Sequence, residues 1–314
     1  MEATFRWVLV TALAPVTWGA TYYVTHQFLP ADHPLYGAVI RALPAGLLLL
    51  LVRRRRPHGS WWWRSLILGT LNMGAFFALV YLAAQRLPTS IAATIMATSP
   101  VVMMLFAWAA LTTRPRVAQL VGAATGIAGV SLMLLDGTGG VDAVGVTASL
   151  TAMLLSSLGY VLAKKWSGDV DVFSLTAWQL VAGGTVLVPV AIVVEGRPPH
   201  LDGAAIVAFG FVSVIATALA FAAWFTGLRH LDAGAVGLVG LLNPVTGVLL
   251  GTVVAGETLA AHQVGGLSLV LLGILLGQPA LARLVARVRR PRAAPHHPAA
   301  DPQPPAASPP RMAR

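Results

Sequence analysis

The chain has 314 residues, of which 57% are hydrophobic and 10% charged, and its formal net charge is +10. This composition excludes an ordinary soluble domain, and no long soluble segment could carry the basic face of a nucleic-acid-binding protein. Cysteine is absent, which excludes a disulfide framework, a thiolate metal site and a thiol nucleophile. The sequence therefore predicts an all-α integral membrane protein that binds no nucleic acid.

Apolar runs of about 20 residues, the length that crosses the hydrocarbon of a bilayer, predict ten transmembrane helices. The predicted spans are 7–26, 34–52, 63–84, 89–111, 116–135, 142–163, 173–194, 203–226, 233–254 and 260–277. The first run follows Arg6 as a signal peptide would. Because nine similar runs follow and no small-residue cleavage site ends it, we interpret it as a span.

The loops between the spans alternate between a basic side and an acidic side. The basic side carries Arg6, the run Arg53 to Arg56, Lys164, Lys165 and the arginines of the C-terminal tail. By the positive-inside rule this side is cytoplasmic. We therefore expect a multi-pass protein of the cell inner membrane with both termini in the cytoplasm.

Two segments outside the spans have biased compositions. The run Arg53 to Arg56 precedes Trp61, Trp62 and Trp63, and we interpret it as an interfacial anchor among membrane lipids, with a specific headgroup or partner site as the alternative. Residues 281–314 are rich in Pro, Ala and Arg. Such a composition cannot bury a core, so it predicts a disordered basic cytoplasmic tail.

The two halves of the chain match each other at an offset of 144 residues. The aligned pairs include Phe77 with Phe221, Pro100 with Pro244, and Gln119 with Gln263. Because each half holds five spans, an odd number, the halves enter the membrane in opposite orientations. The predicted parts are a first five-helix repeat at 1–140, a second, inverted five-helix repeat at 141–280, and the tail at 281–314. Inverted halves predict alternating access around a site near the midplane.

The candidate site lies at the depth of two prolines. Pro100 and Pro244 fall near the centres of their spans, where each should kink its helix and free a carbonyl of the preceding turn. The substrate-binding candidates at this depth are Trp18, Tyr22, Asn72, Phe76, Thr94, Thr98, Ser157, Tyr160, Thr217 and Asn243. Helix packing is the alternative role for each of these side chains.

Two charged residues are candidates for gating or for a structural role. Arg41 lies about seven residues into its predicted span, whereas Arg64 and Arg116 lie at span ends. Gln179 holds the place equivalent to Arg41 in the second half. An intramembrane charge is a functional candidate, but Arg41 could also reach outward to the headgroups. Glu257 precedes the last span and should cap that helix, with gating or coupling as the alternative. The span interiors hold no Asp or Glu, which disfavours a proton-driven exporter of organic cations.

Small residues at helical spacing mark the fifth and tenth spans. They are Gly122, Gly126 and Gly129 in the first of these, and Gly265, Gly266 and Gly273 in the second. Such spacings let helices approach closely. We interpret them as packing positions, with the seam of a homodimer as the alternative.

These features resemble the drug/metabolite transporter superfamily in its ten-helix EamA-like branch, over residues 7–277. The resemblance is carried by Trp18-Gly19, the stretch Pro34 to Arg41, Asn243-Pro244, and Gly256-Glu257-Thr258-Leu259. The matching stretch of the first half reads Thr112-Thr113-Arg114-Pro115, so the acidic position is lost there. The resemblance implies a transporter for export or exchange of small metabolites, often amino acids or related compounds, through a central cavity.

We therefore expect a secondary transporter, working as an exporter, for a small neutral or zwitterionic metabolite such as an amino acid. The alternatives are a flippase for a lipid or a lipid-linked carrier, and a membrane scaffold that transports nothing. A membrane enzyme would need clustered Asp, Glu, His or Ser side chains at mid-depth, and the spans show no such cluster. We expect no cofactor and no metal ion.

Overall fold

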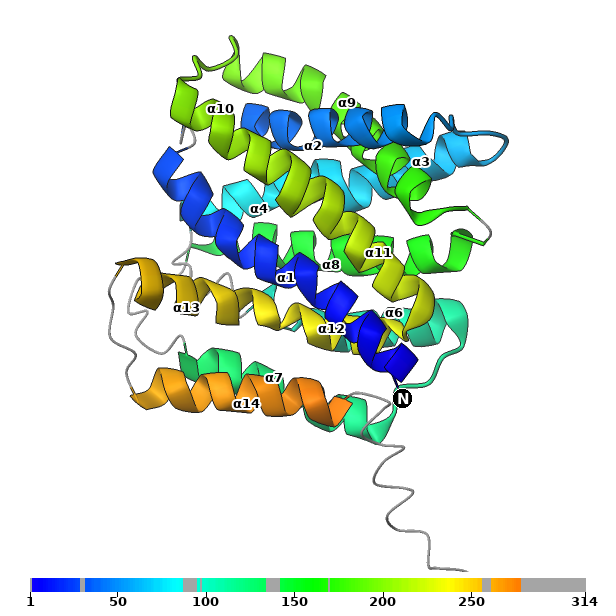
Figure 1. Ribbon diagram of the computed structural model, residues 1–314, viewed down its shortest axis with the longest axis vertical. Coiled ribbons are helices and arrows are strands. Elements are labelled where there is room, and N and C mark those ends of the chain that lie inside the picture. The colour runs from blue at the N-terminus through cyan, green and yellow to red at the C-terminus, as the bar shows by residue number, and fades with distance from the viewer. Residues whose placement is uncertain are drawn as a thin grey trace, which may run out of the picture.

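The computed structural model describes residues 2–28, 32–86, 95–96, 98–133, 142–168, 170–255 and 261–277. Within these residues the helices pack side by side as one bundle and group into ten spans (Figure 1). Five of the helices are long and apolar enough to cross a membrane by length and composition. The all-α membrane fold is thus confirmed, whereas both predicted repeat boundaries and the predicted tail lie outside the described residues.

In the first half the elements are α1 (Glu2–Phe28), α2 (Pro34–Arg53), α3 (Trp61–Gly69), the π-helical segment η1 (Thr70–Gly74), α4 (Ala75–Arg86), α6 (Ser99–Leu111) and α7 (Val117–Met133). In the second half they are α8 (Ala143–Trp166), α9 (Val172–Glu195), α10 (Gly203–Gly210), the π-helical segment η2 (Phe211–Leu219), α11 (Ala220–His230), α12 (Ala233–Gly240), α13 (Leu242–Ala255) and α14 (Ala261–Gly277). The run α3–η1–α4 forms one span, and α10–η2–α11 forms another.

Aspartates fix where several helices begin. The Asp142 carboxylate accepts a hydrogen bond from the Gly145 backbone N–H at 2.8 Å at the start of α8. Asp202 caps α10 in the same way, since its carboxylate accepts from the Ala205 N–H at 2.7 Å. An N-cap side chain supplies an acceptor to backbone donors that the helix itself cannot satisfy. The acidic residues that break the hydropathy pattern therefore also define helix starts.

Equivalent helices of the two halves run antiparallel and pack against each other. At the start of α2 the Leu35 and Tyr36 N–H groups donate to the Glu195 carboxylate, at the end of α9, at 2.5 and 2.9 Å. At the other end of this pair Arg53 of α2 contacts Asp171, just before α9, at 3.2 Å. An antiparallel relation between equivalent elements is what an inverted repeat requires.

The helices α7 and α14 form a second antiparallel pair, at one end of the bundle's long axis (Figure 1). A Cβ atom added to Gly122 would lie 2.5 Å from the carbonyl oxygen of Gly273, and one added to Gly129 would lie 2.6 Å from that of Gly266. The two backbones therefore touch, as small residues permit. These glycines serve packing within the chain, so the predicted homodimer draws no support from them and stays a prediction.

The other helix contacts also occur in equivalent pairs, one in each half. α1 packs on α11 and α13, and its counterpart α8 packs on α4 and α6. α2 contacts η2, and its counterpart α9 contacts η1. Each contact is thus repeated when the first half is exchanged for the second. The site between the halves is therefore built from elements of both repeats.

The structure corrects the prediction of mid-span kinks at Pro100 and Pro244. Each proline lies in the first turn of a new helix, because α6 begins at Ser99 and α13 begins at Leu242. Leu241 forms a turn between α12 and α13. Proline lacks an N–H donor and is tolerated in a first turn, where that donor would have no intrahelical partner. The prolines therefore mark helix breaks.

Candidate functional site

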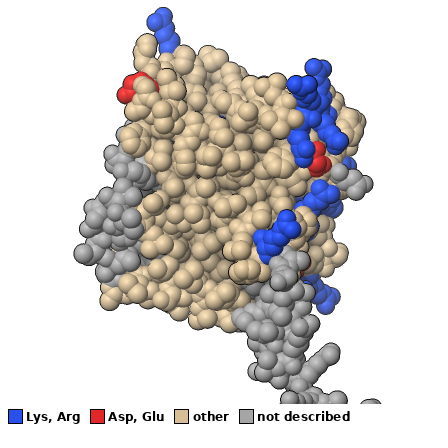
Figure 2. All heavy atoms as spheres, viewed as in Figure 1, with Lys and Arg blue, Asp and Glu red and all other residues tan. Residues whose placement is uncertain are grey.

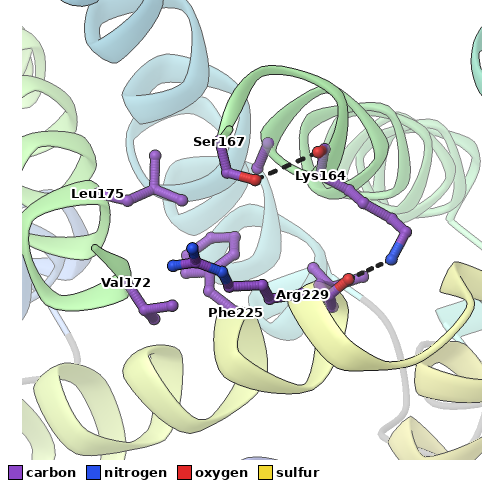
Figure 3. Close-up of a pocket in the computed structure, with 8 residues that line it drawn as sticks. Lys164, Ser167, Val172, Leu175, Phe225 and Arg229 are labelled. Carbon is purple, nitrogen blue, oxygen red and sulfur yellow. Dashed lines mark hydrogen bonds between the residues drawn. The ribbon is translucent and has the colours of Figure 1, made fainter. Parts of the chain in front are cut away.

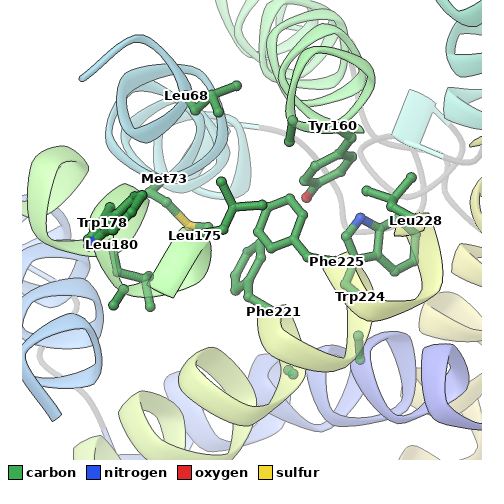
Figure 4. Close-up of a cluster of buried hydrophobic side chains, with 14 of the residues drawn as sticks. Leu68, Met73, Tyr160, Leu175, Trp178, Leu180, Phe221, Trp224, Phe225 and Leu228 are labelled. Carbon is green, nitrogen blue, oxygen red and sulfur yellow. The ribbon is translucent and has the colours of Figure 1, made fainter. Parts of the chain in front are cut away.

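Aromatic side chains from α1, α4, α8 and α11 meet inside the bundle, several of them visible in Figure 4. We call them the aromatic cluster, which consists of Trp18, Phe77, Tyr160, Phe221, Trp224 and Phe225. The Trp18 ring centroid lies 4.9 Å from that of Phe221 and 5.3 Å from that of Trp224. Tyr160 lies 5.4 Å from Trp224. Because Tyr160 is 6% exposed and Phe221 only 1%, the bundle is closed around these rings.

Arg41 reaches the aromatic cluster from α2. Its Nε donates to Thr217 Oγ1 at 2.8 Å, and a terminal nitrogen donates to the Ala216 carbonyl at 3.4 Å. Its guanidinium carbon lies 4.4 Å from the centroid of the Phe77 ring, within the range of a cation–π contact. Trp18 Nε1 donates to the same Ala216 carbonyl at 3.0 Å. The Arg41 side chain therefore points into the bundle, and the alternative of reaching outward to the headgroups is corrected.

The partners of Arg41 belong to a π-helical segment. Thr217 and Ala216 lie in η2, and Asn72 lies in η1 at the corresponding place of the first half. A π-helical turn holds an extra residue, and such turns are frequent at functional sites. The residue pattern of the sequence gives no sign of either segment. Their presence in both halves places irregular backbone beside the candidate site.

Asn72 lies between helices, where it contacts α9 and α8. Its Nδ2 donates to Gln179 Oε1 at 2.7 Å, and the Gln179 Nε2 donates to the Leu175 carbonyl at 3.2 Å. Asn72 Oδ1 is buried and finds no hydrogen-bond partner among the described residues. A Cβ on Gly159 of α8 would overlap this oxygen. The structure therefore shows Asn72 joining η1 to α9, at a site packed against α8.

The other substrate-binding candidates divide by their contacts. Thr98 donates to the Ile95 carbonyl of the preceding turn at 2.7 Å, and the buried Ser157 contacts Met153 Sδ at 3.9 Å. Phe76 lies beside Phe77 at a centroid distance of 5.7 Å, at the edge of the cluster. The hydroxyls of Thr98 and Ser157 contact residues three or four positions earlier in the chain. The structure thus brings together Trp18, Tyr160, Thr217 and Arg41, and leaves Thr98 and Ser157 with local partners.

Asn243 lies at the helix break beside α1. Its carbonyl oxygen would be 2.6 Å from a Cβ on Gly19, and its side-chain Oδ1 is buried without a hydrogen-bond partner in the described part of the chain. This contact joins the two motifs Trp18-Gly19 and Asn243-Pro244. Thr94, Glu257 and the side chain of Tyr22 lie outside what the structure describes.

In Figure 2 most of the visible lysine and arginine side chains lie along the right-hand side of the molecule, and another lies at the upper left. We call the helix ends on the right-hand side the basic end, and the described lysines and arginines there are Arg6, Arg53 to Arg56, Arg64, Arg114, Arg116, Lys164, Lys165 and Arg229. A cavity of about 530 Å³ lies here between α3, α8 and α9. Its lining residues are Arg55, Arg56, His58, Trp61, Trp166, Ser167, Gly168, Val170, Asp171, Ser174 and Trp178.

A second, much smaller pocket of about 10 Å³ is shown in Figure 3. Ser167 lines both pockets, and Phe225 of the aromatic cluster lines the smaller one. Lys164 also lines it, and its Nζ donates to the Leu228 carbonyl and, at 2.7 Å, to the Leu231 carbonyl. The small pocket therefore lies between the larger cavity and the aromatic cluster, and Lys164 joins α8 to α11 beside it.

The sequence analysis does not single out Phe77, Phe221, Trp224, Phe225 or Lys164 as site residues. A signal was present for one pair, since Phe77 and Phe221 align at the 144-residue offset. Their rings lie 6.1 Å apart in the cluster. Aromatic residues are common in apolar spans, so the alignment alone indicates the repeat and not a shared site.

A bundle of two inverted repeats, with a closed site built from both of them, defines a membrane transporter fold. The sequence profile of the EamA-like transporter family matches residues 5–135 and 143–277, and this chain belongs to that family. Each matched segment corresponds to one half of the structure.

Several relatives match over most of their length. The chain is 34% identical over 267 residues to Protein PecM of Dickeya dadantii (strain 3937), which covers 84% of this chain and 90% of that protein. It is 27% identical over 270 residues to the inner membrane transporter YedA of Escherichia coli (strain K12), covering 83% of this chain and 87% of YedA. A solved crystal structure aligns with a TM-score of 0.74 at 18% identity, over 91% of this chain and 99% of the other, which shows the shared fold.

Proposed function

We propose that the chain is a secondary transporter that exports a small metabolite across the inner membrane by alternating access. Family membership and the transporter names of relatives support transport as the function. The observation that carries the mechanism is that the aromatic cluster takes Trp18 and Phe77 from the first half, and Tyr160, Phe221, Trp224 and Phe225 from the second. A site shared between inverted halves can open to either side as the halves move.

The proposed substrate is neutral or zwitterionic and amino-acid-like. Transport does not alter the substrate chemically. Trp18, Tyr160 and Thr217 would contact it after the rings separate, and Arg41 lies beside them. Trp and Tyr offer broad apolar faces together with one polar atom each, which suits a small compound with an apolar part. Asn72, Phe76 and Asn243 would support the walls of the same site.

The proposed orientation places the basic end in the cytoplasm. Trp7, near the start of α1, stacks on His230 at 3.7 Å, and Gly277, the last residue of α14, packs near Gln119 at the start of α7. His230 follows Arg229, and Gln119 is close to Arg116, so both contacts lie at the basic end. They support placing the start of α1 and the end of α14 on the same face of the membrane. Export then begins at the 530 Å³ cavity and requires the small pocket beside Lys164 to open.

The test is flux into proteoliposomes that contain the purified full chain. The panel holds labelled amino acids, organic acids, amines and sugars, with a fluorescent phospholipid to detect lipid flipping. We expect saturable counterflow of at least one small metabolite, which Trp18→Ala lowers. Flux of no compound in the panel, or movement of the phospholipid alone, would contradict the proposal. A scaffold role predicts that Trp18→Ala changes no transport phenotype in cells.

A further inference from the structure

Arg41 and Gln179 occupy equivalent positions in α2 and α9, at an offset of 138 residues. Each joins its helix to a π-helical segment of the other half. Gln179 accepts from Asn72 of η1 at 2.7 Å, and Arg41 donates to Thr217 of η2 at 2.8 Å. The second half thus bridges the two elements with a neutral amide. A neutral amide can therefore make the bridge to a π-helical segment, and this bridge does not itself require the positive charge of Arg41.

Retaining a charge at this depth has a cost. A guanidinium within a span loses hydration, and such groups in membrane proteins mark functional sites by default. Arg41 is partly buried, and its guanidinium carbon lies 4.4 Å from the centroid of the Phe77 ring in the aromatic cluster. A guanidinium keeps its charge at every pH at which proteins fold. The site therefore presents a permanent positive charge beside the aromatic cluster.

We propose that Arg41 binds the anionic group of the substrate, so that the compounds carried are those with a carboxylate. This inference rests on the proposed transport function and redefines its substrate class by the carboxylate, so that simple monocarboxylates are included beside zwitterions. The planar fork of a guanidinium matches a carboxylate, and a charged acceptor binds it more strongly than the neutral Thr217 hydroxyl and Ala216 carbonyl. Carboxylate oxygens would take over these hydrogen bonds as the site opens.

The neighbours of Arg41 account for the rest of such a substrate. Trp18 shares the Ala216 carbonyl with Arg41, and Phe77 lies under the guanidinium. A carboxylate bound at Arg41 would therefore hold its apolar part against these rings, in a site lined mainly by apolar groups with few polar ones. Amines without a carboxylate would meet the positive charge of Arg41 and be rejected.

The experiment compares acids with their amides, which have nearly the same shape but lack the negative charge. The probes are 4-methylpentanoate with 4-methylpentanamide, and leucine with leucinamide, in counterflow with the reconstituted full chain. We expect the wild type to carry the acids in preference to the amides. Arg41→Gln should lower acid uptake about tenfold, the effect of a lost hydrogen bond to a charged group. Uptake of the neutral 4-methylpentanamide should change little, and uptake of the cationic leucinamide should not fall, because the repelling charge is gone. Arg41→Lys should keep part of the acid uptake.

Arg41→Gln reproduces the side chain of the equivalent position, so it should fold, as elution volume and melting temperature would show. Arg86→Gln makes the same change at a half-exposed arginine of α4 and should leave acid uptake unaltered. Equal uptake of acids and amides by the wild type, or equal losses of both in folded Arg41→Gln, would overturn the inference while transport itself stands. The wild-type comparison needs no variant. Flux of no compound at all would reject the transport function too.

Discussion

The Nζ atom of Lys164 in α8 lies 2.7 Å from the carbonyl oxygen of Leu231, just beyond α11. The same ammonium group donates to the Leu228 carbonyl inside α11. Carbonyls in the last turn of a helix have no intrahelical donor, so a lysine that reaches them stabilises the helix end. Because Leu228 and Phe225 both line the small pocket, this contact lies between the basic end and the aromatic cluster, and we expect it to keep the basic end closed.

We predict that Lys164→Met opens the basic end more often. The substitution keeps most of the side-chain volume but removes the charged donor, a loss that shifts such an equilibrium about tenfold. The chain has no cysteine, so Ser167→Cys, in the lining of the pocket, supplies a single labelling site. The rate of its reaction with a maleimide should rise in the Lys164→Met background.

Lys165→Met is the matched control, since the neighbouring lysine is exposed. It should leave the labelling rate unchanged. An equal rise in both variants would mean that loss of positive charge, and not loss of the contact with α11, governs access.

The fold could be predicted because it depends on local features of the sequence, namely the length of each apolar run and the residues repeated between the two halves. Apolar length defines each span, and pairs such as Pro100 with Pro244 reveal the repeat. The odd number of spans in each half then requires the antiparallel relation that Leu35 and Glu195 display. The helix breaks could not be predicted, because hydropathy runs through a break at Leu241 as smoothly as through a kink.

The site could be predicted only in part, because the direction of a side chain depends on the phase of its helix. Asn72 and Phe76 lie four residues apart and would share a face of a regular α-helix. The π-helical segment η1 adds a residue between regular turns and shifts that phase. Asn72 consequently contacts Gln179, while Phe76 lies beside Phe77. Arg41 could be found from its charge alone, but its partner Thr217 depends on tertiary packing.

We predict that Trp18→Phe destabilises the folded protein by about 1 kcal/mol, the usual contribution of one hydrogen bond. Phenylalanine keeps an aromatic ring near Phe221 but removes the Nε1 donor to the Ala216 carbonyl. The melting temperature of the purified full chain should fall. Trp62→Phe is the control, because the Trp62 side chain is 63% exposed, and it should leave the melting temperature nearly unchanged. Equal shifts in both variants would contradict a specific role for the Trp18 hydrogen bond.

We predict that Gly273→Ala separates α7 from α14. The added Cβ would lie 2.5 Å from the Gly122 carbonyl oxygen and 2.7 Å from the Gly126 nitrogen, and these backbone atoms cannot rotate away. Overpacking of this kind costs about 1–3 kcal/mol, which thermal unfolding would detect. Gly265→Ala is the control on the same helix, since its Cβ would meet only Leu132, at 3.6 Å. A Gly273→Ala protein as stable as Gly265→Ala would show that the two helices can part without cost.

The last prediction concerns Asp171, the N-cap of α9 at the basic end. Burial raises the pKa of this carboxyl. Hydrogen bonds from the Ser174 side chain and backbone, and the charges of Arg53 and Arg55, together lower the pKa by more than burial raises it, so the pKa in the folded state is depressed. Arg53 lies 3.2 Å away and Arg55 3.7 Å. A carboxyl with a depressed folded pKa stabilises the fold above its ordinary pKa, and this contribution is lost as the pH falls through the folded value.

Asp171→Asn isolates the charge, because asparagine is an equally good N-cap. The variant should be about 0.5–1 kcal/mol less stable than the wild type at pH 7, the range of a partly exposed ion pair. The difference in melting temperature should begin to shrink as the pH falls below about 4, the ordinary carboxyl pKa, and should vanish only below the depressed pKa of the folded state, where the wild-type carboxyl is also neutral. Asp202→Asn keeps the cap of α10 at a position where no ion pair is found among the described residues, so its effect should be smaller. A destabilisation by Asp171→Asn that stays constant across this pH range would show that the arginine contacts do not carry the effect.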